Sequence, residues 1–250
     1  MPEFNSAQPV GEIVAHFPGA SRLFERHGID YCCGGRSPLE KVCAERGLDA
    51  QAILSEIGAA QQSAPADDRR DWTQALLGDL VEHLLVAYHA PLREELPRLS
   101  QLAGRAAAAH PEGDLLPFGE IFSHLGELRA ELESHMRKEE VVLFPAVARL
   151  EQAVADPQIR SMAAEPCGSI AYPIRAMEHE HLEASAQLAA LRGLTGGFAV
   201  PEGACATVAA LVEGLATLET DLHRHIHLEN EILFPRALAL ASEGAEPRTG

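Results

Sequence analysis

Apolar residues recur at alternating intervals of three and four along four long stretches of the sequence, roughly 73–104, 118–151, 170–193 and 203–241. That spacing is typical of the buried stripe of a bundle helix, and no run of alternating β-branched residues indicates a sheet. Segments rich in glycine and proline separate the stretches. Helices of about 25 residues, each about 37 Å long, suit an antiparallel four-helix bundle, so we expect an all-α fold.

The second and fourth stretches share a motif, H-x3-E-x3-LFP, which begins at His135 and again ninety residues later at His225. A histidine precedes each motif by a similar interval. His89 lies 46 residues before His135, and His181 lies 44 residues before His225. Two helix pairs with corresponding polar positions predict a bundle with approximate two-fold symmetry, in which equivalent side chains point at one centre.

Six polar residues occupy stripe positions where the bundle pattern asks for an apolar side chain: His89, His135, Glu139, His181, His225 and Glu229. A single histidine on such a stripe is more often a hydrogen-bonded core residue. Two carboxylates and four imidazoles in one core would carry a heavy desolvation cost without a compensating cation. Residues i and i+4 lie one turn apart on one face, so a histidine can hold one metal ion while the glutamate reaches between two. The pattern therefore predicts a two-metal site.

The donor set of imidazoles and carboxylates without cysteine favours iron, with manganese as the alternative. Structural zinc is usually closed by four ligands, often cysteines. Six ligands shared by two ions leave positions open for an oxo bridge, oxygen or nitric oxide. A ferritin-like centre, the second choice, needs paired E-x-x-H motifs, and only Glu178 to His181 has that spacing.

The net charge of -17 is spread along the sequence. Such an acidic surface repels phosphate backbones, which argues against a nucleic-acid partner. No window approaches 18 consecutive apolar residues, and the N-terminal residues lack the basic start and apolar run of a secretory signal, so we expect no membrane span and a cytoplasmic location. The five cysteines are an odd number, with Cys32 and Cys33 adjacent and the other three scattered. They do not form the disulfide framework of a small secreted domain, so we expect reduced thiols.

The first 60 or so residues predict short helices. One is expected to begin with Ser37 as cap and Pro38 in the first turn and to end at Gly47, and another to run from about residue 49 to 59. Residues 61–70 have the composition of a linker. We therefore expect a small helical domain over 1–62, a bundle over 71–241 and a disordered tail over 242–250.

Several residues near the expected ligands carry secondary predictions. His179, His223 and His227 each lie two residues from a ligand, about 200° round the helix, and are expected to face solvent. Glu131 and Glu180 could line an access path or hydrogen-bond a ligand. Pro91, two residues after His89, should perturb its helix.

The segment DYCCGG at residues 30–35, followed by this series of motifs, resembles the iron–sulfur cluster repair di-iron proteins, the Repair of Iron Centres family. The resemblance extends from Val10 to Pro235. It rests on DYCCGG, on YH ending at His89, on SHMRKEE at residues 134–140, on EH ending at His181 and on residues 225–235. It implies a hemerythrin-like four-helix bundle preceded by a small helical N-terminal domain.

The resemblance also implies roles for the residues. The family's centre contains two iron ions joined by an oxo bridge. Its terminal ligands match His89, His135, His181 and His225, and its bridging carboxylates match Glu139 and Glu229. The implied function is repair of clusters damaged by oxidative or nitrosative stress, by donating iron to damaged iron–sulfur proteins rather than as an enzyme. The chain is expected to be a cytoplasmic homodimer.

Two alternatives remain open. One is a nitric oxide reductase acting at the di-iron centre, and the other is a hemerythrin-like module that senses oxygen or nitric oxide. Hemerythrins proper use five histidines, whereas this seam supplies four, which argues against simple oxygen carriage. Cys32 and Cys33 could be redox-active, could transfer iron, or could only end a helix at the diglycine.

Overall fold

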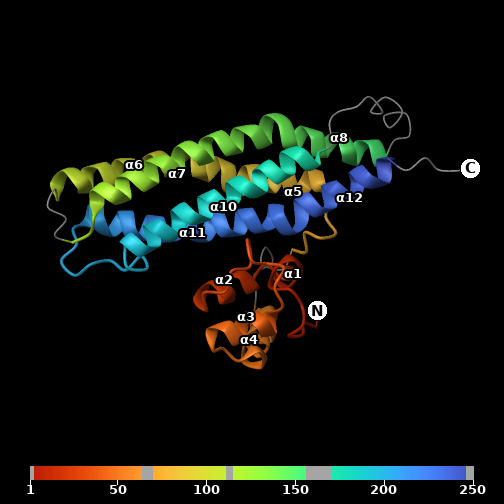
Figure 1. Cartoon of the computed structure of the whole chain (residues 1–250), viewed down its shortest axis with the longest axis horizontal. Coiled ribbons are helices and arrows are strands. Elements are labelled where there is room, and N and C mark those ends of the chain that lie inside the picture. Colours follow the sequence, from red (N-terminus) through yellow and green to blue (C-terminus); the bar gives the residue numbers. More distant parts are fainter. Residues whose placement is uncertain (1–2, 64–69, 111–114, 156–169, 246–250) are drawn as a thin grey trace, which may run out of the picture. The chain divides into compact units, whose positions relative to one another are not determined.

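A computed structural model of the chain describes residues 3–63, 70–110, 115–155 and 170–245 (Figure 1). They fall into two compact units. The bundle unit comprises residues 81–149 and 166–222, and the terminal unit comprises residues 1–80, 150–165 and 223–250. The expected all-α fold is confirmed, since the described residues form helices, turns and one isolated bridge between Pro9 and Pro38.

The bundle unit is built on long helices that follow the predicted stretches. They are α5 (Leu77–Leu84), α6 (Ala90–Ala109), α7 (Phe118–Lys138), α8 (Phe144–Ala155), α10 (Ala171–Leu194) and α11 (Ala206–His227), of which α5, α8 and α11 also extend into the terminal unit. Leucine-rich stripes from α6, α7, α10 and α11 form one core, in which Leu96, Leu128, Leu188 and Leu215 are buried. Removal of these apolar surfaces from water is the main force that holds the helices together.

The terminal unit contains four short helices from the N-terminal part of the chain: α1 (Val10–His16), α2 (Ala20–Arg26), α3 (Leu39–Arg46) and α4 (Ala50–Ser63). It also contains the last turns of α11 and the helix α12 (Phe234–Ala245). Phe24, Tyr31, Leu39 and Ile57 belong to its core, together with Ile226 near the end of α11. The N-terminal helices therefore form a core of their own, to which Ile226 of α11 contributes.

Three π-helical turns interrupt the long helices: η2 (Leu85–His89), η3 (Glu139–Leu143) and η4 (Leu228–Leu233). Each ends two residues before a proline, namely Pro91, Pro145 and Pro235. Proline has no N–H to donate, and its ring clashes with the carbonyl four residues earlier, which in all three cases lies inside the π-helical turn. The wider turn accommodates that clash. Pro97 lies inside α6 without such a turn, so a proline alone does not produce one.

The predicted perturbation at Pro91 is thus confirmed, and so is the helix end at Gly47, which has the left-handed φ of 67° that favours glycine. The predicted cap at Ser37 is wrong. α3 begins at Leu39 with Pro38 in the cap position and no side-chain cap, because the carbonyl of Ser37 instead accepts the N–H of Val10 at 3.0 Å.

Other expectations fall at the limits of the described residues. α4 continues to Ser63, so the expected linker is helical at its start, and residues 64–69 lie outside the described residues. α12 continues to Ala245, beyond the expected start of the tail at residue 242. Residues 246–250 also lie outside the described residues.

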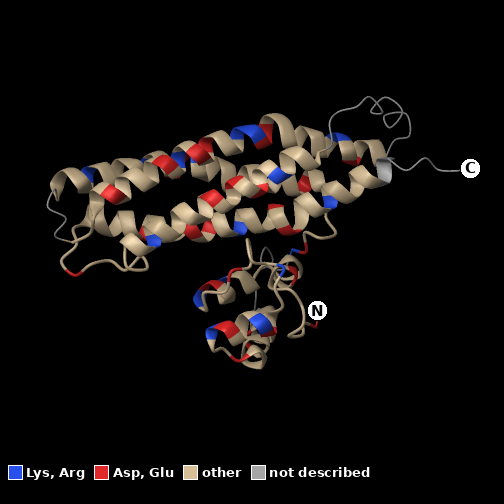
Figure 2. Cartoon of the chain, in the orientation of Figure 1, with Lys and Arg blue, Asp and Glu red and all other residues tan. Residues whose placement is uncertain are grey.

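Acidic residues are distributed along the helices of each unit rather than gathered in one patch (Figure 2). This agrees with the even spread of negative charge along the sequence. In the part of the chain that the structure describes, no helix is long and apolar enough to cross a membrane.

Asp30 organises the DYCCGG segment. Its Oδ1 accepts the backbone N–H of Cys32 at 3.1 Å and of Cys33 at 2.9 Å, and the Cys32 thiol donates to it at 3.5 Å. Burial alone would raise the pKa of the Asp30 carboxyl, but the hydrogen bonds from Cys33, Gly34 and Cys32 together hold it below its ordinary value. The ionised carboxylate therefore fixes the turn that carries both thiols.

We expect Asp30→Ala to lower the free energy of unfolding of the terminal unit by about 1–2 kcal/mol, because two backbone N–H groups lose a charged acceptor. Asp30→Asn keeps the oxygen and should lose less. Urea unfolding followed by the fluorescence of Trp72, the sole tryptophan of the chain, reports on this unit. Equal unfolding of wild type and Asp30→Ala would contradict this role.

Candidate metal centre

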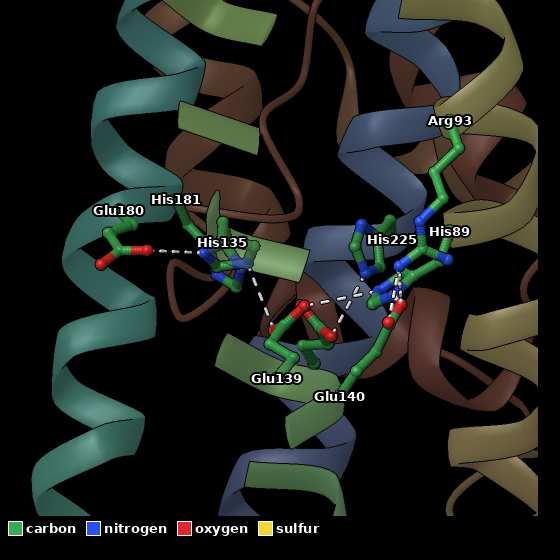
Figure 3. A network of polar contacts seen from close by, with 9 residues as sticks. His89, Arg93, His135, Glu139, Glu140, Glu180, His181 and His225 are labelled. Carbon is green, nitrogen blue, oxygen red and sulfur yellow. Dashed lines mark hydrogen bonds and ion pairs between the residues drawn. The ribbon is translucent and has the colours of Figure 1, made fainter. Parts of the chain in front are cut away.

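Four of the six predicted ligands come together in the core of the bundle unit. His89 is the last residue of η2, His135 lies in the final turn of α7, Glu139 begins η3 and His181 lies in the middle of α10. All four are nearly or fully removed from solvent, with 0–3% of each residue exposed. Figure 3 shows these side chains converging from separate helices. The stripe pattern had placed each of them on a buried face, and this prediction is confirmed.

The Glu139 carboxylate lies between two imidazoles. His135 Nε2 is 3.2 Å from Glu139 Oε1, and His89 Nε2 is 3.4 Å from Glu139 Oε2. His181 approaches from the other side of His135, with the two Nε2 atoms 3.1 Å apart. Three Nε2 atoms and one carboxylate therefore share a small buried space.

The outer nitrogen of His89 is held by a carboxylate. His89 Nδ1 lies 2.7 Å from Glu140 Oε1, and Arg93 Nη2 donates to both oxygens of Glu140 at 2.6 and 2.5 Å (Figure 3). Burial alone would raise the pKa of the Glu140 carboxyl, but the hydrogen bonds from Arg93 and His89 hold it below its ordinary value. An ionised carboxylate only accepts hydrogen bonds, so Nδ1 of His89 carries the proton.

His135 is held in the same way. Its Nδ1 lies 2.9 Å from Glu180 Oε2, and Lys138 donates to the other oxygen. Burial alone would raise the pKa of Glu180, but Lys138 and His135 lower it. Of the two roles predicted for Glu180, the hydrogen bond to a candidate ligand is the one that the structure contains. Glu131 has a different environment, in which burial and the nearby Glu183 raise its pKa.

These contacts determine which atoms face the centre. With Nδ1 of each ring engaged by a carboxylate, Nε2 is the atom of His89 and of His135 that faces the oxygens of Glu139. Neither of those oxygens has a hydrogen bond of ordinary geometry within the described residues. A buried carboxylate without such bonds is costly, and a cation bound here would be coordinated by its oxygens and by the Nε2 atoms. The donor set of nitrogen and oxygen therefore fits a metal ion of the iron class.

The remaining two predicted ligands lie one turn apart near the end of the chain. His225 is in the last turn of α11, and Glu229 is the second residue of η4. His225 Nε2 lies 3.2 Å from Glu229 Oε1, and the two residues are 1% and 0% exposed. This reproduces the 3.2 Å contact between His135 and Glu139. The repeat in the sequence is therefore a repeat in geometry.

The π-helical turns coincide with the candidate ligands. His89 ends η2, while Glu139 and Glu229 lie at or next to the starts of η3 and η4. An extra residue in a helical turn rotates the side chains on either side relative to each other, and such turns are frequent at functional sites. The prolines that follow them therefore help to set the direction in which these side chains point.

Sequence reasoning missed three residues around the site. Glu140 and Arg93 were not singled out, although a carboxylate next to a ligand is the common signal for such a partner. His227 was expected to face solvent but is 2% exposed, because Tyr31 packs against its ring at a centroid distance of 5.4 Å. Burial lowers the pKa of His227 to about 4, so the ring is neutral at pH 7. The exposure predicted for His179 is confirmed.

The vicinal thiols are reduced in the structure. Cys32 and Cys33 are free, with their sulfur atoms 3.9 Å apart. Cys32 is buried and Cys33 is half-buried. The hydrogen bond with Cys33, together with burial, raises the pKa of the Cys32 thiol well above its usual range. A redox or iron-transfer role for the pair stays a prediction.

Comparison with known proteins places this geometry in a family. The model of the hemerythrin HHE cation binding domain matches residues 80–237, and that of a domain of unknown function, DUF542, matches residues 6–61. The sequence is 38% identical over 231 residues to the iron–sulfur cluster repair protein YtfE of Edwardsiella ictaluri, covering 92% of this chain and 96% of the relative. The chain belongs to the YtfE family of iron–sulfur cluster repair proteins.

Other members of the YtfE family are similar to the same extent. The protein of that name from an Enterobacter species is 38% identical over 232 residues, and that from Escherichia coli O157:H7 is 37% identical over the same length. Each match covers 93% of this chain and 97% of the relative. The predicted family and the hemerythrin-like bundle are thus confirmed, and the match favours the HHE arrangement over the ferritin-like alternative.

We expect Glu140→Gln to weaken metal binding by about 10–100-fold, the usual effect of losing a partner that orients a ligand. The neutral amide no longer holds Nδ1 of His89 with a full charge, and it loses the ion pair with Arg93. Competition with a chromophoric chelator measures the change. Glu133→Gln is the matched control, because Glu133 pairs with Arg129 at the exposed surface of the neighbouring helix α7. Equal affinities of the two variants would contradict this role.

Proposed function

We propose that the chain binds two iron ions and donates iron to iron–sulfur clusters damaged by oxidative or nitrosative stress. The observation that carries the proposal is the buried set of imidazole nitrogens and carboxylate oxygens that face one another. Such a set is costly in an apolar core without a cation. The names of the YtfE relatives supply the biological context.

The proposed ligands are those that the sequence indicated: His89, His135, Glu139, His181, His225 and Glu229. In support, His135 and Glu139 in the bundle unit make the same 3.2 Å contact as His225 and Glu229 in the terminal unit. In the proposal the two glutamates would bridge the ions, with two histidines at each metal position.

Iron is the proposed metal because its two common oxidation states accept mixed nitrogen and oxygen ligands. When bound, the pair supplies redox-active ions that can leave for a damaged cluster. The protein side chains hold the ions, orient the imidazoles through Glu140 and Glu180, and exclude water from the centre. The client molecules are then iron–sulfur proteins that have lost iron.

Other parts of the prediction belong to this proposal. It includes a cytoplasmic setting, which is consistent with the four free cysteines in the described residues. It also includes a division into an N-terminal domain over 1–62 and a bundle domain over 71–241. Homodimer formation and binding of nitric oxide or oxygen stay predictions.

The ligand assignment predicts two irons per chain in anaerobically loaded protein. His225→Ala should lower this to one or none, because it removes an imidazole from one of the two positions. His179→Ala is the matched control, since His179 is exposed and pairs with Glu183 on the surface of α10. Elemental analysis with Mössbauer spectroscopy of both variants measures occupancy. Full occupancy in His225→Ala would refute the assignment.

The function is tested with a hydratase whose [4Fe–4S] cluster has been damaged by nitric oxide or peroxide. We expect iron-loaded protein to restore hydratase activity under reducing, anaerobic conditions, and the metal-free protein and the His225→Ala variant to fail. Free ferrous iron at the same concentration is the control for simple reloading. Failure of the loaded protein would refute iron donation. Sustained turnover of nitric oxide to nitrous oxide would instead indicate a reductase, and a reversible oxygen adduct would indicate a carrier or sensor.

A further inference from the structure

The two halves of the repeat differ on the helix face beside their glutamates. A shift of ninety residues relates His227 to Arg137 and Asn230 to Glu140. Arg137 is exposed, whereas His227 is buried. Glu140 holds the imidazole of His89 in the bundle unit, whereas Asn230 has a different partner. The pseudo-symmetry is therefore broken at the residues that flank Glu229.

Both of these residues contact the backbone of the DYCCGG segment. His227 Nδ1 donates to the carbonyl of Tyr31 at 3.3 Å, and Asn230 Nδ2 donates to the carbonyl of Cys32 at 3.3 Å. His227 precedes Glu229 by two residues, and Asn230 follows it directly. The carbonyls of two consecutive residues of the segment thus accept hydrogen bonds from residues that precede and follow the candidate ligand Glu229 in the sequence.

A glycine contact extends this attachment. A Cβ atom on Gly35 would lie 2.6 Å from the Tyr31 carbonyl oxygen and 2.7 Å from Glu231 Oε1, and one on Gly11 would lie 3.0 Å from Glu231. Glu231 therefore packs where only glycine leaves room. Its counterpart in the first half of the repeat, Val141, is 67% exposed. The second glycine of DYCCGG is required for close packing against η4.

A fourth contact lies on the other side of His225. Arg224 donates to both oxygens of Glu25 at 3.3 and 3.1 Å, and the Tyr31 hydroxyl donates to Glu25 Oε1 at 2.8 Å. The N-terminal segment is therefore bonded or packed to residues 224, 227, 230 and 231. These positions enclose both candidate ligands of the terminal unit, His225 and Glu229.

We propose that the DYCCGG segment positions the ligand-bearing turn of η4, with His227 and Asn230 as the positioning residues and the Tyr31 and Cys32 carbonyls as their fixed partners. The proposal rests on the proposed metal centre for its effect on iron, but the contacts themselves concern only the protein. It assigns the N-terminal domain a part in holding the bridging Glu229, in addition to any chemistry of its thiols.

The η4 turn needs positioning contacts because it is π-helical. Such turns are rare because their backbone is less favourable than that of an α-helix, so a turn persists where neighbouring contacts stabilise it. In η3 these contacts come from the bundle, through Glu140. In η4 they come from the N-terminal segment. Fixing the turn before metal binds reduces the conformational entropy that a ligand must lose on coordination.

The first test uses metal-free, full-length protein and peptide-resolved hydrogen exchange. In Gly35→Ala, amides of residues 226–234 should exchange about tenfold faster than in the wild type, while residues 136–144 of the other half should be unchanged. Asn230→Asp, which has the same shape but no donor for the Cys32 carbonyl, is the second variant if Gly35→Ala fails to fold. Unchanged exchange in 226–234, or equal acceleration of both segments, would overturn the proposal.

The second test measures iron release from loaded protein to a ferrous chelator. We expect release to be about tenfold faster in His227→Leu, in line with the effect of losing a partner that orients a ligand. His227→Asn should restore slow release, because the amide nitrogen of asparagine occupies the place of Nδ1. Arg137→Leu is the matched control at the equivalent exposed position. Equal release from His227→Leu and Arg137→Leu would overturn the effect on iron.

The two tests separate this inference from the proposed function. If wild-type protein binds no iron pair, the proposed function fails, whereas the exchange measurement still decides whether the segment fixes η4. If iron binds but the variants exchange residues 226–234 at the wild-type rate, the proposed function stands and the positioning role is refuted.

Discussion

The close approach of imidazole nitrogens and carboxylate oxygens in the buried core of the bundle is the constraint on which the rest of the site depends. Glu140 and Glu180 each take the proton-bearing nitrogen of an imidazole, so that the other nitrogen of His89 and His135 faces Glu139. Without a cation this arrangement costs free energy, and apolar side chains of similar size would pack there more stably. The fold thus gives up stability at its centre to hold a metal-binding geometry.

The backbone is adapted to the same purpose. Prolines at equivalent distances after η2, η3 and η4 favour a wider turn where candidate ligands are placed. The leucine stripes of α6, α7, α10 and α11 pack into one core and fix these helices against one another. A rigid core and locally irregular turns therefore act together, since the core sets the distance between helices and the turns set the direction of the side chains.

Sequence periodicity predicted the bundle and the burial of all six ligand positions, because a polar residue on an apolar stripe has few physical explanations. It failed where burial comes from outside the helix. A helical wheel places His227 opposite His225, and nothing in the helix indicates that Tyr31 covers that face. The cap at Ser37 failed for a related reason, since its carbonyl is engaged by Val10. Periodicity within a helix predicts which of its faces are apolar. Contacts with residues distant in sequence decide which further faces are buried.

The broken symmetry of the repeat shows what such distant contacts do. Arg137 and Val141 in the first half are exposed, whereas the equivalent His227 and Glu231 in the second half pack against the N-terminal segment. The residues on the second face are explained by the domain that they contact, so that domain and the ligand-bearing turn form one structural element.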